Sequence, residues 1–177
     1  MPEEITYYIG QALGIAAVVF GFISFQKKTP GGIIIWQMAT ALAFSLNYLL
    51  IGAMTGVAIN AIAAVKGLLY YYRDKRGSKS LLLPIIFSVI MVIATILTWE
   101  AWYSIFILTG VLINVIVFAV FPPQKVRYCM LIKAPITVVY NIFVFSIGGI
   151  VYETMVFVSS VIGIARYREK RASESEV

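Results

Sequence analysis

Among the polar residues inside the apolar stretches of this sequence, five have side chains suited to hold a polar solute: Asn47, Asn60, Asn114, Asn141 and Glu153. An amide both donates and accepts hydrogen bonds, and a carboxylate accepts them or carries a proton. Inside a membrane such groups are costly unless they have partners, so each position is a candidate for a substrate-binding site. Packing is the alternative role, because asparagines also join membrane helices and a glutamate near an interface can extend to water.

The sequence offers no recognisable catalytic or metal-binding set. It has no histidine and one cysteine, Cys129, and Glu153 is the only acidic residue well inside the apolar stretches. The run from Arg76 to Ser80 lacks the upstream glycine of a phosphate-binding loop, and no nucleophile motif occurs. We therefore expect a protein that is not an enzyme and that uses no cofactor and no metal ion.

Composition indicates which elements position the polar residues. Hydrophobic residues make up 61% of the 177 and charged residues 12%, which is far from the balance of a soluble domain. Seven spans of about 20 residues, the length that crosses a bilayer, use most of the chain. Function must therefore lie within the bilayer or on short loops.

We expect an all-α integral membrane protein with seven transmembrane helices. Their expected ranges are 5–25, 32–51, 55–72, 81–98, 102–121, 128–145 and 149–166. Trp99 and Trp102 flank Glu100 between the fourth and fifth ranges. Two indoles around a charge are typical of a turn at the membrane surface.

Basic residues predict how the helices are oriented. The first, third and fifth gaps and the end of the chain contain lysines and arginines, whereas the second, fourth and sixth gaps contain none. This positive-inside pattern predicts an external N-terminus and a cytoplasmic C-terminus. Lys66 and Lys133 lie within spans, and we expect both to extend to the cytoplasmic surface rather than to act as buried counter-ions. Glu3 and Glu4 precede the first apolar run, the reverse of a signal peptide, so we expect that span to be retained.

A short motif occurs twice at a constant spacing of 93 residues. Gly56, Asn60 and Arg73 recur as Gly149, Glu153 and Arg166, and each copy follows a glutamine beside a lysine, Gln26 in the first and Gln124 in the second. If each copy has three helices, the single helix between them makes the copies parallel, as in transporters built from parallel repeats.

The repeat predicts four divisions of the chain. These are a first three-helix repeat with the cytoplasmic loop that follows it (1–80), a linker helix (81–99), a second three-helix repeat (100–167) and a charged cytoplasmic tail (168–177). We expect the tail to be disordered because it is short, charged and contains serine. Pro135 falls inside the sixth span, where a proline removes a backbone hydrogen bond and can act as a hinge.

Two stretches carry a resemblance to a known family: LLIGAMTGVAINAI from Leu49 and SIGGIVYETMVFVSSVIGIARYR from Ser146. They resemble the YgjV-like bacterial inner-membrane proteins. The plan of two helix triplets, with Pro123-Gln124 at the end of the fifth span, also resembles the SWEET and PQ-loop transporters. That resemblance implies a central route with alternating access, a sugar-contacting role for Asn60, and hinges at Pro123, Gln124 and Gln26.

The sequence departs from the SWEET pattern at two places. Glu153 stands in the seventh span at the position equivalent to Asn60, and Phe25 precedes Gln26 where a PQ-loop has proline. The carboxylate argues against a neutral sugar as the solute. Nicotinamide riboside transporters share the general plan, so vitamins are the rival substrate class.

We therefore predict a transporter or facilitator of a small polar solute, sugar-like or vitamin-like, in the bacterial inner membrane. Its expected partners are the solute and the lipid bilayer and not nucleic acid, because membrane topology already explains the basic residues. Homo-oligomerisation stays open. The alternative is a membrane receptor or assembly factor that uses the same bundle to bind a partner, an idea motivated by the basic cytoplasmic rim and tail.

Overall fold

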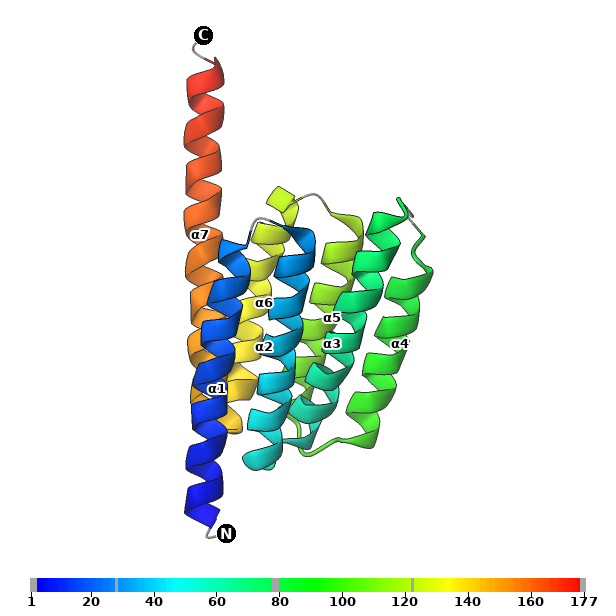
Figure 1. The fold of residues 1–177 in the computed structure, drawn as a ribbon, viewed down its shortest axis with the longest axis vertical. Coiled ribbons are helices and arrows are strands. Elements are labelled where there is room, and N and C mark those ends of the chain that lie inside the picture. The colour runs from blue at the N-terminus through cyan, green and yellow to red at the C-terminus, as the bar shows by residue number, and fades with distance from the viewer. Residues whose placement is uncertain (1–2, 28, 78–79, 122, 176–177) are drawn as a thin grey trace.

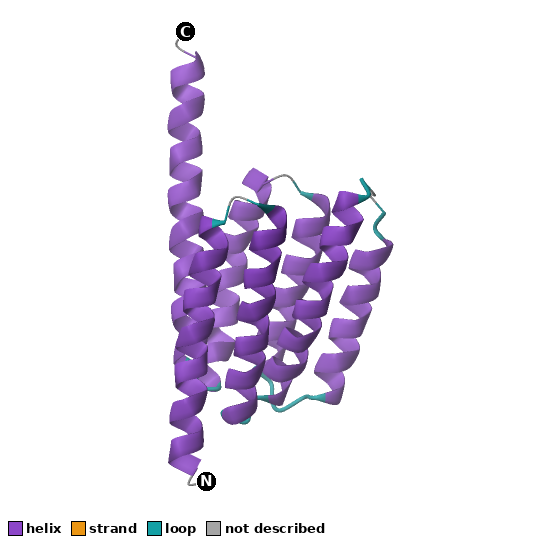
Figure 2. Ribbon diagram, viewed as in Figure 1, coloured by secondary structure: helices purple, strands orange, loops and turns teal. Residues whose placement is uncertain are grey.

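The computed structural model describes residues 3–27, 29–77, 80–121 and 123–175, so the predicted cytoplasmic cations Lys28 and Lys79 lie outside the described residues. Within the described residues the chain forms helices and short loops (Figure 2). The helices are α1 (Glu3–Gln26), α2 (Pro30–Leu50), α3 (Met54–Lys75), α4 (Leu82–Leu97), α5 (Ser104–Val120), α6 (Pro123–Phe143) and α7 (Ile147–Ser175). Each predicted span corresponds to one of them, so the prediction of an all-α, seven-helix membrane protein is confirmed.

The helices differ in how fully they could cross a bilayer. In the described part of the chain, α1, α2, α3, α6 and α7 are long and apolar enough to span a membrane. The other two are shorter apolar helices, with 16 residues in α4 and 17 in α5. At 1.5 Å per residue they rise about 25 Å, slightly less than the hydrocarbon core of a typical bilayer.

Six of the helices form a ring. Along the chain α1 packs on α2, α2 on α3, α5 on α6, and α6 on α7; α7 also packs on α1, and α3 touches α5. The remaining helix, α4, packs against α3 and α5 at the edge of the bundle (Figure 1). This arrangement leaves the faces of α2, α3, α5, α6 and α7 turned toward a common interior.

Two turns of the bundle have the same backbone structure. Gly52, between α2 and α3, has a φ of 81°, and Phe145, between α6 and α7, has a φ of 54°. The backbone N–H that follows each turns back to a helix carbonyl, Ala53 to Tyr48 at 2.8 Å and Ser146 to Asn141 at 2.9 Å. This left-handed residue after a helix end is the usual way to satisfy the last carbonyls. Glycine adopts it without strain, whereas Phe145 adopts it against its preference.

The predicted spacing of 93 residues extends to the helix boundaries. Pro30–Leu50 and Pro123–Phe143 are related by that spacing at both ends, and α3 and α7 begin 93 residues apart. Proline at the first position of α2 and α6 fits both starts, because its missing N–H would have no partner there. Thr29 precedes Pro30 and its Oγ1 accepts a hydrogen bond from the Gly32 N–H at 3.3 Å.

Two sequence predictions about the ends of elements are wrong. Gln26 and Gln124 are not equivalent, because Gln26 ends α1 whereas Pro123 and Gln124 begin α6 rather than end α5. The predicted disordered tail is helical through Ser175, and α7 extends well beyond the rest of the bundle (Figure 1). The composition of this segment allows it to continue the helix of α7.

Candidate functional site

A cavity of about 1000 Å³ lies inside the ring of helices. Its lining combines aromatic and aliphatic side chains with polar ones, the latter including Gln37, Thr40, Asn60, Lys66, Asn114, Lys133, Thr137, Asn141, Glu153 and Ser160. A mostly apolar hollow with a few convergent polar groups is the usual form of a small-molecule site. The cavity is large enough for a solute of several tens of atoms.

The cavity is open at one end of the bundle. We call this the basic end; it holds the α1–α2 and α5–α6 loops and the end of α3. Its lining there includes the exposed residues Gln37 and Lys75. At the opposite end, which we call the closed end, the lining residues Tyr48 and Asn141 are 4% and 1% exposed. The cavity therefore reaches solvent at the basic end, where a solute could enter.

An ion pair lies on one wall of the cavity. The Lys133 ammonium donates to Oε1 of Glu153, and the two side chains are 8% and 6% exposed. The second carboxylate oxygen of Glu153, Oε2, is buried and has no hydrogen-bond partner. Burying two charges is repaid only when pairing and further hydrogen bonds are good. The unsatisfied Oε2 is therefore free to accept a hydrogen bond from a bound molecule.

The prediction that Lys133 extends to the cytoplasmic surface is wrong, because its ammonium is held by Glu153 inside the bundle. Glu153 likewise does not extend to the outer interface, since it is 5% exposed. Lys133 is in the middle of α6 and Glu153 is in the second turn of α7. The pair forms because α6 and α7 pack side by side.

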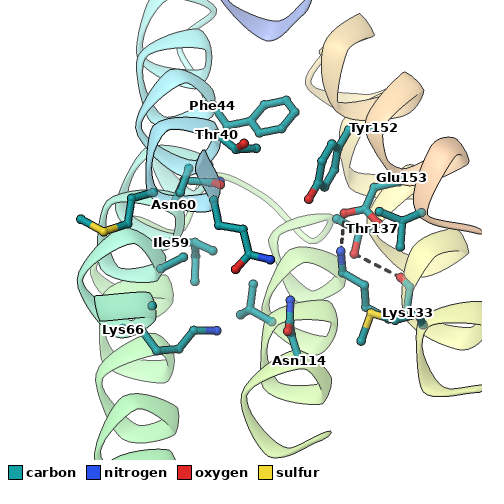
Figure 3. Close-up of a pocket in the computed structure, with 18 of the residues that line it drawn as sticks. Thr40, Phe44, Ile59, Asn60, Lys66, Asn114, Lys133, Thr137, Tyr152 and Glu153 are labelled. Atoms are coloured by element: carbon teal, nitrogen blue, oxygen red, sulfur yellow. Dashed lines mark hydrogen bonds and ion pairs between the residues drawn. The ribbon is translucent and has the colours of Figure 1, made fainter. Parts of the chain in front are cut away.

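Three more polar side chains reach into the cavity. Asn60 and Lys66 come from α3, across the cavity from Lys133 and Glu153, and Asn114 comes from α5 and lies between the two sides (Figure 3). Asn60 donates one hydrogen bond to the Gly56 carbonyl at 3.0 Å, which leaves its amide oxygen toward the cavity. These groups can donate and accept hydrogen bonds to a polar solute.

Lys66 also lines the cavity. It is half-buried, and its ammonium lies over the Tyr70 ring, 5.8 Å from the ring centre. No carboxylate forms an ion pair with it in the described ranges of the chain. Tyr70 lies one turn nearer the basic end of α3, so the extension of Lys66 to the cytoplasmic surface stays a prediction.

Hydrogen bonds between side chains seal the closed end. The Tyr48 hydroxyl donates to Oδ1 of Asn141 at 2.6 Å, and the Tyr140 hydroxyl accepts from the Gly56 N–H at 2.9 Å. The two tyrosine rings meet edge to face, with ring centres 6.0 Å apart. All four residues are buried. This layer joins α2, α3 and α6 across the interior.

Gly56 and Gly149 each make room for a neighbouring side chain at the closed end. A Cβ at Gly56 would lie 2.6 Å from Cγ of Tyr48, and a Cβ at Gly149 would lie 2.0 Å from Oδ1 of Asn141. In each half, the glycine near the start of one helix therefore makes room for a side chain eight residues earlier. Tyr48 and Asn141 are themselves 93 residues apart.

Asn47 lies behind the cavity and not in it. Its Nδ2 donates to the Gly10 carbonyl at 2.7 Å, and its Oδ1 accepts from the Ser146 hydroxyl at 2.8 Å. It is fully buried and joins α1, α2 and the α6–α7 turn. The structure thus brings together four of the five predicted binding residues, Asn60, Asn114, Asn141 and Glu153, and places the fifth in the packing between helices.

Three of the predicted hinge residues, Gln26, Pro123 and Gln124, lie at the basic end of the bundle, and Pro135 lies near the middle of α6. Gln26 ends α1, and Pro123 and Gln124 begin α6. Pro135 is inside α6 with an exposed ring, two residues after Lys133. Because proline has no N–H, the carbonyl one turn earlier lacks its helix bond, which weakens α6 beside the ion pair. Their hinge role stays a prediction.

Sequence reasoning missed Lys66, Lys133, Thr40, Thr137 and Tyr48 as cavity residues. The spacing of 93 was a usable signal for most of them. It pairs Thr40 of α2 with Lys133 of α6, and Tyr48 of α2 with Asn141 of α6. The positions that line the cavity on one of these helices can therefore be obtained from those on the other. For Lys66 the sequence carried no such signal, because only the fold shows that its ammonium has room inside.

Comparison with known proteins identifies a family and no specific activity. Residues 8–171 match the family model Imp-YgjV, which is described as a bacterial inner membrane protein. No curated protein and no solved structure matches the chain significantly. The family description agrees with the apolar helices of the structure, whereas the chemistry of a solute has to be inferred from the cavity.

Proposed function

The chain belongs to the Imp-YgjV family of bacterial inner membrane proteins, and we propose that it is a transporter or facilitator of a small polar solute that works by alternating access. One observation carries this proposal. A polar-lined cavity lies inside the ring of apolar helices, is open at one end and is closed at the other by hydrogen-bonded side chains. A pocket that reaches the surface at one end only is what one state of such a transporter requires.

Polar groups without a protein partner support a role in binding a solute rather than a role in packing helices together. A polar side chain that only joins helices has its hydrogen-bonding groups paired, as Asn47 has. Glu153 Oε2 is buried and has no such partner. Unpaired polar groups within a membrane are costly. A solute that bonds to them would offset that cost.

The repeated turns support a rocking motion. α2 with α3 and α6 with α7 are equivalent at a spacing of 93, and Tyr48 and Asn141 seal the closed end from equivalent positions. If the two three-helix units rock against each other, separating this pair opens the closed end while the basic end narrows. With the N-terminus outside, as the basic residues predict, the structure corresponds to a cytoplasm-facing state.

Uptake into proteoliposomes tests the proposal. We expect the purified protein to move at least one solute from a panel of sugars, amino acids, organic acids and vitamins faster than empty vesicles do. Asn60→Leu and Glu153→Gln should slow this uptake, because the first removes an amide from the cavity and the second replaces the carboxylate with a neutral amide. Thr154→Val is the matched control, since Thr154 is exposed on the other side of α7 and bonds only its own helix.

Two results would refute the proposal. If no solute in the panel enters above the empty-vesicle rate, transport must be abandoned. If uptake occurs but Asn60→Leu and Glu153→Gln both match the wild type, the cavity is not the route.

The receptor alternative has one observation in its favour, the continuation of α7 beyond the bundle (Figure 1). A helix that projects from the membrane-embedded part offers a surface to a partner. Truncation after Arg166 distinguishes the two ideas. A transporter should keep its uptake rate, whereas a receptor should lose a stoichiometric partner recovered with the full chain.

A further inference from the structure

The charges around the cavity are unequal. Among its described lining residues, four side chains are cationic and one is anionic: Lys66, Lys75, Arg127 and Lys133 against Glu153. Lys75 is exposed where the cavity opens. A hollow lined mainly by one sign of charge concentrates solutes of the opposite sign.

The single carboxylate is already paired. Glu153 uses Oε1 to neutralise Lys133, so that pair has no net charge to offer. Lys66 remains as the cation inside the cavity without a carboxylate in the described part of the chain, and only the Tyr70 ring lies against its ammonium. Lys66 is half-buried, and an ammonium that lies within a membrane protein without a counter-ion is costly. The missing element at this position is an anion.

On the Glu153 side of the cavity the missing group is a hydrogen-bond donor. Glu153 Oε2 is buried and accepts no hydrogen bond, so it has room for a donor. Figure 3 shows Lys66 on one side of the open space, Lys133 and Glu153 on the other, and Asn114 between them. A molecule that spans this space would meet an ammonium at one side and a free carboxylate oxygen at the other.

From this arrangement we propose that the cavity binds a small organic anion that also carries an N–H or O–H donor. Its acidic group, a carboxylate or a phosphate, lies against Lys66 with Asn114 beside it, and its donor bonds to Oε2 of Glu153. The ligand supplies the charge that Lys66 lacks and the hydrogen that Glu153 lacks. This inference deepens the proposed function and rests on it, since it names the class of solute.

Matched ligand pairs test the charge of the solute. The pairs are gluconate with glucose, pantothenate with panthenol, and glycerol 3-phosphate with glycerol, each measured by the shift in melting temperature of the purified protein. We expect the acid of at least one pair to raise the melting temperature while its neutral counterpart does not. The carboxylates and the phosphate in the panel distinguish the two kinds of acidic group.

Variants locate the binding. Lys66→Met should weaken binding of the acid by about tenfold or more, as expected for loss of a charge-assisted hydrogen bond. Lys66→Arg should retain binding, because the charge remains. Lys125→Met, the same change at an exposed position outside the cavity, is the control. Lys66 has no ion pair to lose, so Lys66→Met should fold normally.

A bilayer arm distinguishes a lipid headgroup from a free solute. If vesicles with an anionic phospholipid stabilise the wild type and not Lys66→Met, the anion is a lipid headgroup, and the assigned chemistry of Lys66 still holds. The proposal is overturned if neutral members bind and acids do not, if no acid and no anionic lipid shifts the melting temperature, or if Lys66→Met binds the acid as the wild type does. Acid binding without uptake would refute transport alone, and uptake of a neutral solute unaffected by Lys66→Met would refute the anion alone.

Discussion

The buried ion pair makes the sharpest energetic prediction of this structure. Lys133 and Glu153 are each less than a tenth exposed. Replacing one partner leaves the other charge buried and unpaired. Such losses typically cost about 3–5 kcal/mol. The cavity reaches solvent at the basic end, so we expect the lower part of that range.

The perturbation is a double-mutant cycle of Lys133→Met, Glu153→Leu and the combination of both. For a chain of this length, a loss of 1 kcal/mol lowers the melting temperature by roughly 2–4 °C, so each single change should lower it by roughly 6–15 °C. The double variant should lie closer to the wild type than either single variant, because replacing both charges with apolar groups of similar size is often neutral. Thermal unfolding in detergent measures all four proteins.

The coupling energy between the two substitutions shows whether Lys133 and Glu153 interact. If the pair exists, the effects of the single changes are far from additive, as expected for residues in contact. Two single variants that each unfold close to the wild-type temperature would refute the buried pair. So would a double variant whose loss equals the sum of the single losses, because that result describes two independent residues.

Two further predictions concern packing and topology. Gly149→Ala should destabilise the protein by about 1–3 kcal/mol, since its Cβ would lie 2.0 Å from Oδ1 of Asn141. Gly67→Ala adds a Cβ that has no atom within 4 Å. This control should be neutral or stabilising by up to about 1 kcal/mol. Equal melting temperatures of these two alanine variants would contradict the packing of the closed end. In a Cys129→Ser background, cysteines at Ser80 and Ser173 should react with an impermeant thiol reagent from the cytoplasmic side, and a cysteine at Ala101 from the outside. Labelling of Ser80 and Ser173 positions from opposite sides would overturn the seven-span topology.

The helices could be predicted from sequence because five of the described helices are apolar over the length of a bilayer, α4 and α5 are apolar over slightly less, and each ends at a physical signal. Cations mark the ends at the basic side, and Trp99 and Trp102 mark the turn between α4 and α5. Helix ends were less predictable where composition was the only guide. The region after Arg166 reads as a charged tail, yet a helix already formed by α7 propagates at little cost.

Side-chain partners could be predicted less well, because hydropathy says nothing about the rotation of one helix against its neighbour. Asn60, Asn114 and Glu153 were identified as cavity residues by the cost of a polar group in a membrane. The same reasoning selected Asn47, whose cost is met by Gly10 and Ser146 instead. The cost of burying a polar group shows only that the group needs a hydrogen-bonding partner. The fold shows whether that partner is a protein group or a solute.

The ion pair also explains why the two halves of the cavity differ. At the spacing of 93, Thr40 corresponds to Lys133 and Asn60 corresponds to Glu153. The first half is therefore neutral at both positions, and the second half is charged at both. A single buried charge is strongly unfavourable while a pair is tolerated, so the two charges have to occur together.

This asymmetry affects how a solute can bind. A cavity between two identical parallel repeats would offer a solute two equivalent orientations related by the two-fold axis. With Lys66 on α3 and the paired Glu153 on α7, an acidic group and a donor group have different positions to occupy. If the cavity binds the proposed anion, the charged residues select one orientation, and the affinity for a solute with both groups should exceed that for a solute with either group by itself.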